Sequence, residues 1–267
     1  MKLASLWIGD RLGPIEILSA QSFLAAGNEL TIFAYGPLAD VPEGVEVRDA
    51  EPILSGEKIL RYPFHGWPSL HSNLFRYAII ATGEYVWVDL DVLALKAFRF
   101  DTPYVFGWEN ETSVNGAVLG LPPDSPALAE FLKYKVDTIG FPPVMTTWQR
   151  RKLWLRSLGR GSEIEKWGHA AIGPKAVTHF LTKSGEIAHA MPREAFYPVR
   201  WEDTSKLVAP GAIDPDGMPP EAYGVHLWGF QIKRAIKWRR GGTIPPDSFV
   251  GVHAARLGAA KLRDHAP

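Results

Sequence analysis

The sequence predicts an α/β protein with a Rossmann-like, mixed and mostly parallel central sheet. Short apolar segments alternate with helical segments over the first third of the 267-residue chain, the pattern that parallel strands with crossover helices produce. Prolines near the expected helix starts and glycines after the expected helix ends mark the boundaries. No repeat, low-complexity tract or linker divides the chain, so we expect a single domain.

The first half contains the most regular series of elements. Pro14 stands at the start of the first expected helix, and Gly27 and Gly83 stand where C-terminal caps are expected. This strand–helix–strand opening indicates a nucleotide-type crevice at the carboxyl edge of the sheet. The expected strands are 3–9, 29–36, 44–50 and 84–92, and the expected helices are 14–27 and 68–83.

The second half is less regular. Ser125 followed by Pro126 is a strong helix start, because serine caps helices and proline fits the first helical position. The segment 188–220 is rich in proline and turn residues, which predicts loops with isolated strands. The expected strands are 103–110 and 113–121, and the expected helices are 124–137, 146–158 and 172–185.

The composition limits the class of protein. Lysine plus arginine and aspartate plus glutamate number 29 each, so the net charge indicates no nucleic-acid partner. The absence of cysteine excludes a disulfide scaffold and a thiolate metal site, and it fits a reducing compartment. The apolar run in the first residues is short, so we expect no signal peptide there, and no window reaches the roughly 18 apolar residues of a membrane span. We therefore expect a cytoplasmic enzyme or binding protein.

Asp89 and Asp91 follow an apolar run at the end of the expected strand 84–92. Burying unpaired charge is costly, so a buried strand that ends in two carboxylates indicates a use for them. Alternate residues of a strand share a face, and both carboxylates can then reach one divalent cation at the carboxyl edge. Hard oxygen ligands of this kind suit Mg²⁺ or Mn²⁺ bridging to a diphosphate.

Two other interpretations of these aspartates stay open. In one, the carboxylates only accept hydrogen bonds in a turn at the strand end. In the other, the chain is a phosphatase with Asp89 as nucleophile and Asp91 as acid/base. Such a phosphatase needs a later acidic pair after an apolar strand, and the available pair, Asp214 and Asp216, lies in a proline-glycine turn.

The stretch SNLFRYAIIATGEYVWVDLDVLALKAF, residues 72–98, resembles a group of glycosyltransferases with the glycosyltransferase-A (GT-A) fold. These enzymes share an S-[DN]-x-x-R-Y helix and a G-x-[YW]-x-D-x-D strand. They form the α-1,4-galactosyltransferase/mannosyltransferase-like group (glycosyltransferase family 32-like), which is related to the sugar-binding region of large clostridial toxins. The segments SLWIGDRLGPIEILSAQSF, VNGAVLGLP and VHLW resemble further landmarks in the same order, so the resemblance extends from Leu6 to Trp228.

The resemblance implies a GT-A domain with three parts. A nucleotide-binding part covers about 1–98, an acceptor-side part about 99–240 and a C-terminal tail about 241–267. It also implies a metal-dependent transfer of a hexose, with retained anomeric configuration, from a UDP-sugar or GDP-sugar to a glycan or lipid-linked saccharide. Such a reaction belongs to polysaccharide biosynthesis. The alternative is a non-catalytic relative that binds sugar nucleotides.

The resemblance further implies the metal site and its chemistry. Asp91 is the direct ligand of Mn²⁺ or Mg²⁺, and Asp89 contacts the donor and binds the cation directly or through water. His226 is a further ligand from a late loop, with a packed core histidine as the alternative. Trp228 closes over the diphosphate from the same loop. Arg76 contacts the sugar or supports the carboxylates, with a surface salt bridge as the alternative.

The remaining implied donor-binding residues lie in three segments. The end of the first strand supplies backbone contacts and an apolar surface for the nucleobase, although a core tryptophan is as good an interpretation of Trp7. Asn115 and Gly116 bind sugar hydroxyls and allow close approach of the backbone, or form a plain turn. The full set is Trp7, Ile8, Gly9, Ser72, Asn73, Arg76, Asp89, Asn115, Gly116 and Trp228.

Two further features stay open at this stage. A double displacement needs a carboxylate beside the anomeric carbon, for which Glu109 and Glu111 are the candidates, whereas a front-face route needs none. The basic segment 230–242 predicts the solvated face of a helix. Its alternative is a patch that brings the enzyme to the inner face of a membrane as a peripheral protein.

Overall fold

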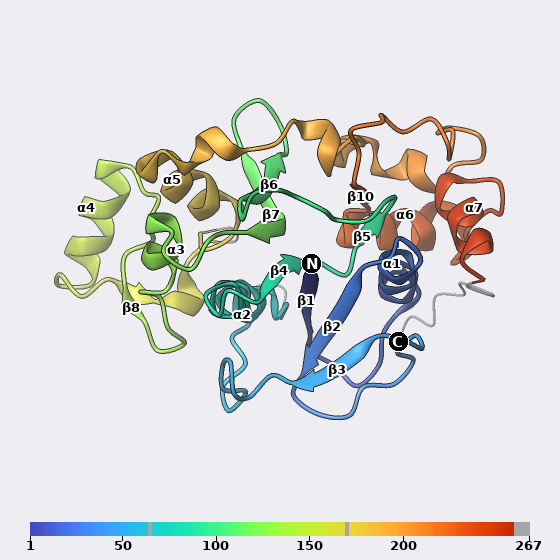
Figure 1. Cartoon of the computed structure of the whole chain (residues 1–267). Coiled ribbons are helices and arrows are strands. Elements are labelled where there is room, and N and C mark those ends of the chain that lie inside the picture. The colour runs from blue at the N-terminus through green and yellow to red at the C-terminus, as the bar shows by residue number, and fades with distance from the viewer. Residues whose placement is uncertain (64–65, 169–170, 259–267) are drawn as a thin grey trace. The chain divides into compact units, whose positions relative to one another are not determined.

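The computed structural model describes residues 1–63, 66–168 and 171–258 (Figure 1). The strands are β1 (Lys2–Trp7), β2 (Glu29–Ala34), β3 (Glu46–Asp49), β4 (Tyr85–Val88), β5 (Val92–Ala94), β6 (Val105–Trp108), β7 (Val114–Gly120), β8 (Ile139–Gly140), β9 (Ser162–Glu163) and β10 (Gly224–His226). The α-helices are α1 (Pro14–Ala25), α2 (Ser69–Ile80), α3 (Pro126–Phe131), α4 (Thr147–Arg156), α5 (Pro174–Ser184), α6 (Gly229–Arg240) and α7 (Phe249–Arg256). The 3-10 helices are η1 (Ile164–Lys166), η2 (Glu186–His189), η3 (Arg193–Ala195) and η4 (Trp201–Val208).

The central sheet has six strands in the order β3-β2-β1-β4-β7-β6 and is mixed but mostly parallel. Two small sheets, β10-β5 and β8-β9, accompany it. The predicted α/β class with a mostly parallel sheet is therefore confirmed, while the GT-A fold stays a prediction. Among the described residues, no helix combines the length and the apolar character that a membrane crossing requires.

The chain divides into two compact units built from interleaved segments. Unit 1 comprises Met1–Arg48, Val88–Asp101 and Pro192–Pro267, and unit 2 comprises Asp49–Trp87 and Thr102–Met191. The division assigns the segment that follows β4 and the late segment that contains β10 to the same unit. Each unit is described separately below.

Unit 1 is organised around β1, β2 and the helices that cover β5. β1 and β2 pair in parallel from Lys2↔Glu29 to Trp7↔Ala34, and α1 forms the crossover between them (Figure 1). Two buried serines of α1 hold β5: Ser19 Oγ donates to the Val92 carbonyl (2.6 Å), and Ser22 Oγ accepts from the Ala94 N–H (2.8 Å). These hydrogen bonds fix the strand that directly follows the two aspartates.

The apolar core of unit 1 joins α1 and β5 to the C-terminal helices. Its members are all buried, and they come from α1, from β5 and from the late segment of the unit that contains β10, α6 and α7. They include Ile15, Leu18, Leu93, Val225, Leu227, Ile232, Ile236, Phe249 and Val250. Helix α7 therefore belongs to the core of this unit although it lies in the predicted tail; residues 259–267 of that tail lie outside the described residues.

Unit 2 is organised around the antiparallel pair β6–β7, and all seven residues of β7 are buried. The Tyr77 ring of α2 stacks on Phe131 with centroids 4.0 Å apart, and its hydroxyl donates to the Ile172 carbonyl (2.6 Å). The predicted cap is confirmed, because Ser125 Oγ accepts from the Leu128 N–H (3.1 Å). Ser125 and Pro126 therefore start α3 as the sequence predicted.

Three boundaries differ from the sequence predictions. The expected helix 124–137 ends at Phe131, and beyond it the Thr138 hydroxyl accepts from the Lys135 N–H (2.7 Å), a local bond that competes with helix continuation. The expected loops of 188–220 contain η3 and η4, since buried Thr204 and Leu207 repeat at the three-residue spacing of a 3-10 helix. The expected strand 84–92 ends at Val88, with consequences for the site.

Candidate metal centre

Asp89, Asp91 and His226 lie together in unit 1, with one ligand atom from each within 4.8 Å of the others. Among the described residues this is the single group of three or more acidic, histidine or cysteine side chains with that spacing. The pairing of β5 with β10 creates it, because Val92 is the register partner of His226. The structure therefore brings together the three residues for which the sequence predicted metal ligation.

A turn places the two aspartates, rather than one face of a strand. β4 ends at Val88, and the Val92 N–H donates to the Asp89 carbonyl across the turn (3.2 Å). The prediction that Asp89 and Asp91 are alternate residues of one strand is therefore wrong. Their carboxylates converge because the chain reverses between β4 and β5.

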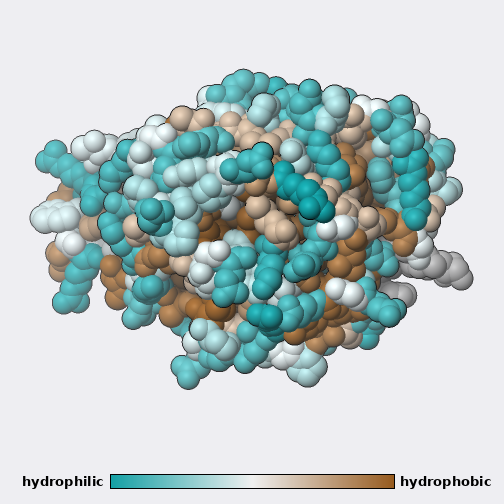
Figure 2. Space-filling model, viewed as in Figure 1, coloured by the Kyte–Doolittle hydropathy of each residue, from teal (hydrophilic) through white to brown (hydrophobic). Residues whose placement is uncertain are grey.

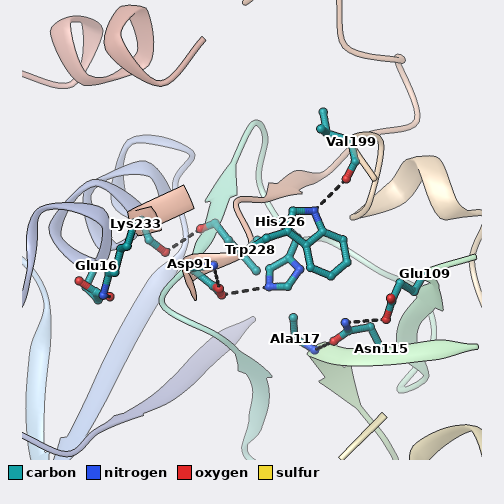
Figure 3. Close-up of polar contacts among 12 residues, drawn as sticks. Glu16, Asp91, Glu109, Asn115, Ala117, Val199, His226, Trp228 and Lys233 are labelled. Atoms are coloured by element: carbon teal, nitrogen blue, oxygen red, sulfur yellow. Dashed lines mark hydrogen bonds and ion pairs between the residues drawn. The ribbon is translucent and has the colours of Figure 1, made fainter. Parts of the chain in front are cut away.

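Both carboxylate oxygens of Asp91 have defined contacts (Figure 3). Oδ1 lies 3.1 Å from His226 Nε2, and Oδ2 accepts from the Gly229 N–H at 2.6 Å. The Asp91 carbonyl also accepts from the Leu227 N–H (2.7 Å). Side chain and backbone of Asp91 are thus both tied to the segment that joins β10 to α6.

The surroundings of Asp91 keep its side chain ionised. Burial alone would raise the pKa of this carboxyl group. The charge and hydrogen bond of His226, the Gly229 N–H and the charge of Lys233 more than offset burial and lower the pKa to about 2. Asp91 is therefore a carboxylate at neutral pH, the form that binds a cation.

The donor set fits a divalent cation of intermediate hardness. Two carboxylates suit Mg²⁺ and Mn²⁺, and a neutral imidazole nitrogen favours Mn²⁺ of the two. His226 is buried, and its ring lies 4.2 Å from the Trp228 ring and 5.7 Å from the Tyr197 ring. His226 can thus pack in the core and also offer a ring nitrogen to a cation.

Trp228 directs the start of α6 toward Asp91. Its backbone adopts the left-handed conformation (φ 56°), which is strained for a residue with a side chain. The indole N–H donates to the Val199 carbonyl (3.0 Å), which anchors the side chain (Figure 3). The first N–H of α6, at Gly229, then meets the Asp91 carboxylate, where the positive end of the helix dipole favours negative charge. The role of Trp228 over a diphosphate stays a prediction.

Gly229 is a site residue that the sequence prediction missed. A Cβ atom added there would lie 2.9 Å from Asp91 Oδ2 and 3.3 Å from Asp91 Cβ. Only glycine lets the helix start approach the carboxylate this closely. The one sequence signal is a glycine directly after the VHLW segment, where a capping residue would be more usual.

Gly229→Ala should therefore weaken metal binding. We expect the added methyl group to displace the Asp91 carboxylate and to reduce Mn²⁺ affinity by roughly 10- to 100-fold, as for other changes next to metal ligands. Isothermal titration of the purified variant with Mn²⁺ measures this. Gly36→Ala is the matched control, because a Cβ at Gly36 meets nothing within 4 Å. Equal Mn²⁺ affinities of the two variants would contradict the assigned role of Gly229.

A buried ion pair supports the same helix from α1. Glu16 is 4 % exposed, and its Oε1 accepts from Lys233 Nζ at 2.6 Å (Figure 3). Its Oε2 is buried without a hydrogen-bond partner. The Lys233 ammonium also lies 6.0 Å from the centre of the Trp7 ring. The sequence predicted no role for Glu16 and placed Lys233 on the solvated face of the segment 230–242, whereas the structure pairs it with a buried carboxylate.

The predicted nucleobase surface at the end of β1 is partly exposed. Trp7 is half-buried rather than a core residue, and its indole N–H donates to the Arg11 carbonyl (2.8 Å). Ile8 is half-buried and Gly9 is exposed. A Cβ at Gly9 would lie 3.0 Å from Trp7 Nε1, so glycine here leaves room for the indole. Their contact with a nucleobase stays a prediction.

In unit 2, the predicted residues of α2 form a buried polar cluster. Arg76 is 6 % exposed, which rules out the alternative of a surface salt bridge. Its Nη1 donates to Asn73 Oδ1 (3.1 Å), and its guanidinium lies 5.1 Å from the centre of the Trp87 ring. Ser72 is half-buried beside them. The implied contact of these residues with a donor sugar stays a prediction.

The 115–116 pair of unit 2 is strand backbone rather than a plain turn. Both residues belong to β7, and a Cβ at Gly116 would lie 2.6 Å from Arg76 Nη1, so this glycine makes room for the guanidinium. Asn115 Nδ2 donates to Glu109 Oε2 (2.8 Å), and Asn115 Oδ1 accepts from the Ala117 N–H (2.8 Å) (Figure 3). Glu109 is thus hydrogen-bonded to Asn115, and neither transfer route is decided by this contact.

The acidic pair considered for a phosphatase has a local role. Asp214 Oδ1 accepts from the Asp216 N–H (3.0 Å) within the turn. Both carboxylate oxygens of Asp216 accept from Arg256 at 2.7 Å, and this exposed pair lowers the pKa of Asp216. These contacts connect the turn to α7 and give the phosphatase interpretation no support.

A comparison with models of protein families finds no match to this chain, and a comparison with curated proteins finds no significant match.

Proposed function

We propose that the chain is a metal-dependent, retaining glycosyltransferase that moves a hexose from a nucleotide sugar to a glycan or lipid-linked saccharide. The observation that carries the proposal is the Asp89–Asp91–His226 group at the carboxyl end of a sheet strand. Ligand sites of open α/β sheets lie at that edge. The resemblance of residues 72–98 to the D-x-D glycosyltransferases supplies the reaction class.

Several residues of unit 1 would together bind a charged donor. Asp89, Asp91 and His226 would hold Mn²⁺ or Mg²⁺, and Gly229 fixes the orientation of Asp91. A cation held by these residues would supply positive charge against the negative charge of a departing nucleoside diphosphate. The N-terminus of α6 supports this role, because helix N-termini favour anionic groups. The roles of Ser72, Asn73, Arg76, Asn115 and Gly116 in unit 2 rest on the resemblance.

A thermal-shift panel tests the metal bridge. UDP and GDP should raise the melting temperature much more with Mn²⁺ than with a chelator, since the diphosphate then binds through the cation. A ligand at a hundred times its dissociation constant contributes roughly 2.7 kcal/mol to the free energy of unfolding. The panel of UDP, GDP, UDP-hexoses and GDP-hexoses also ranks the donors, with UDP-sugars as the first expectation.

Three outcomes would change the proposal. Equal shifts with Mn²⁺ and with chelator would remove the cation from the donor site. Metal-dependent binding without slow hydrolysis of any donor by water would favour the non-catalytic relative. Release of phosphate from simple phosphomonoesters would favour the phosphatase.

A further inference from the structure

Helix α4 is stabilised by hydrogen bonds at its two ends and not by packing in a core. At its start Thr146 Oγ1 accepts from the Gln149 N–H (3.2 Å), while Gln149 Oε1 accepts from the Thr146 N–H (3.0 Å). At its end the Gly159 N–H donates to the Trp154 carbonyl (2.8 Å), with Gly159 in the left-handed region. None of its ten residues is buried. The stability of so short a helix is marginal in water when no side packs against a core. Contact with another surface would therefore stabilise α4.

The uncovered residues of α4 and the turn after it are large and apolar. Trp148 is 67 % exposed, and Leu158 is 90 % exposed. Trp154 and Leu155 are exposed as well. In Figure 2, brown hydrophobic atoms lie between teal ones over the α4–β8 region. Four large apolar side chains exposed within one short segment indicate an interaction surface.

The same segment is strongly basic. Between residues 146 and 161 there are five cations and no acidic residue: Arg150, Arg151, Lys152, Arg156 and Arg160. In the described part of the chain none of the five forms an ion pair with a carboxylate. Instead, Arg150 lies 4.9 Å from the Phe141 ring centre and Lys152 lies 4.8 Å from the Trp148 ring centre. The charge of this segment is therefore complementary to an anionic surface.

A groove of about 430 Å³ runs beside α4 within unit 2. Of the described residues, none with an acidic side chain lines it, although Lys166 pairs with Glu163 nearby (3.1 Å). Among the described residues, its walls carry four cations and two tryptophans, a combination that suits a phosphate group with an attached apolar chain. The residues concerned are Trp148, Lys152, Arg156, Lys166, Trp167 and Lys175.

We propose that α4 and this groove dock unit 2 on a membrane surface with anionic phosphate headgroups. Basic helices with exposed tryptophan and leucine lie in the lipid interface, where the cations are attracted to anionic lipids. A second copy of the chain is a poor occupant, because five cations would face five cations. A nucleic acid would satisfy the charges but would leave Leu155 and Leu158 in water. The inference is independent of the transferase proposal.

Helix α6 provides the contrast. It buries Ile232 and Ile236 in the core of unit 1, so core packing stabilises it. Its exposed side carries Arg234 and Lys237 together with Phe230 and Trp238, which are 51 % and 75 % exposed. This arrangement supports the solvated interpretation of the segment 230–242. The two helices thus differ in their packing: α6 buries part of its surface in a core, whereas no residue of α4 is buried.

Co-sedimentation of the full chain with lipid vesicles tests the proposal. We expect binding to phosphatidylcholine vesicles that contain phosphatidylglycerol, little binding to phosphatidylcholine alone, and weaker binding as salt rises. Arg151→Gln with Arg156→Gln should weaken binding roughly 25-fold, about fivefold for each cation near an anionic surface. Leu155→Gln with Leu158→Gln should remove the binding that survives at high salt. All four residues are exposed, so the variants should fold.

The matched control is Arg234→Gln with Lys237→Gln on α6, which changes the charge equally and should bind vesicles like the wild type. Brominated lipids should quench tryptophan fluorescence, and Trp148→Phe with Trp154→Phe should lose most of the quenching. Equal binding to neutral vesicles, or an equal loss in the α6 control, would overturn the proposal. So would unchanged vesicle binding of the Leu155/Leu158 variant together with equally tight binding to an RNA oligonucleotide, which would indicate a polyanion site.

Discussion

Asp91→Asn should abolish the stabilisation of the protein by nucleoside diphosphate with Mn²⁺, and with it the slow hydrolysis of a nucleotide sugar. The amide keeps the volume of the side chain and can still accept from the Gly229 N–H, so the fold should persist. It removes the charged ligand oxygen. We expect Mn²⁺ affinity to fall by roughly 100-fold or more, beyond the 10- to 100-fold loss typical of changes outside the ligand set. Mn²⁺ titration, melting curves and donor hydrolysis measure the three effects.

Asp101→Asn is the matched control, because Asp101 is an exposed carboxylate of the same unit. It should behave like the wild type in all three measurements. If Asp91→Asn retained the Mn²⁺-dependent shift, the cation would not bind at this group. A trapped aspartyl phosphate on Asp89 would instead establish the phosphatase.

His226→Ala should raise the Mn²⁺ concentration needed for half-maximal donor hydrolysis by roughly 10- to 100-fold. The change also removes a buried ring between Trp228 and Tyr197, so a stability loss of roughly 1–3 kcal/mol accompanies it. Stability alone therefore does not identify the role. The metal requirement does.

His253→Ala separates the two effects. His253 packs on the Phe249 ring (4.5 Å) in the core helix α7 and is no member of the metal group. Its loss should reduce the melting temperature while the Mn²⁺ requirement stays at the wild-type value. A His226→Ala variant with the same pattern as His253→Ala would assign His226 to packing and leave two carboxylates at the site.

The elements that the sequence predicted well have strong local signals. Pro14 and Gly27 bound α1, and Ser125 starts α3 with the expected cap. The apolar runs of β1 and β2 are short and continuous, as buried parallel strands require. Local propensity and tertiary packing agree in these segments.

The candidate site could be predicted only in part. The three ligand candidates came from a resemblance to known motifs, whereas their convergence depends on the pairing of β5 with β10, which brings together Asp91 and His226, 135 positions apart. Gly229 was missed because a glycine before a helix has many explanations until its distance to Asp91 is known. The Glu16–Lys233 pair was missed for the same reason, since it connects residues 217 positions apart.

The interleaving of the two units has a consequence for biosynthesis. The chain passes from one unit to the other after Arg48, Trp87, Asp101 and Met191, so neither unit is a continuous stretch that a ribosome could finish and release. Asp91 is made 135 residues before His226, which corresponds to roughly 7–27 s at 5–20 residues per second. Throughout that interval the nascent acidic turn exists without its imidazole and without the α6 N–H that lowers its pKa. The Asp89–Asp91–His226 group is therefore completed among the last events of synthesis, and truncated chains that end before residue 226 should lack it.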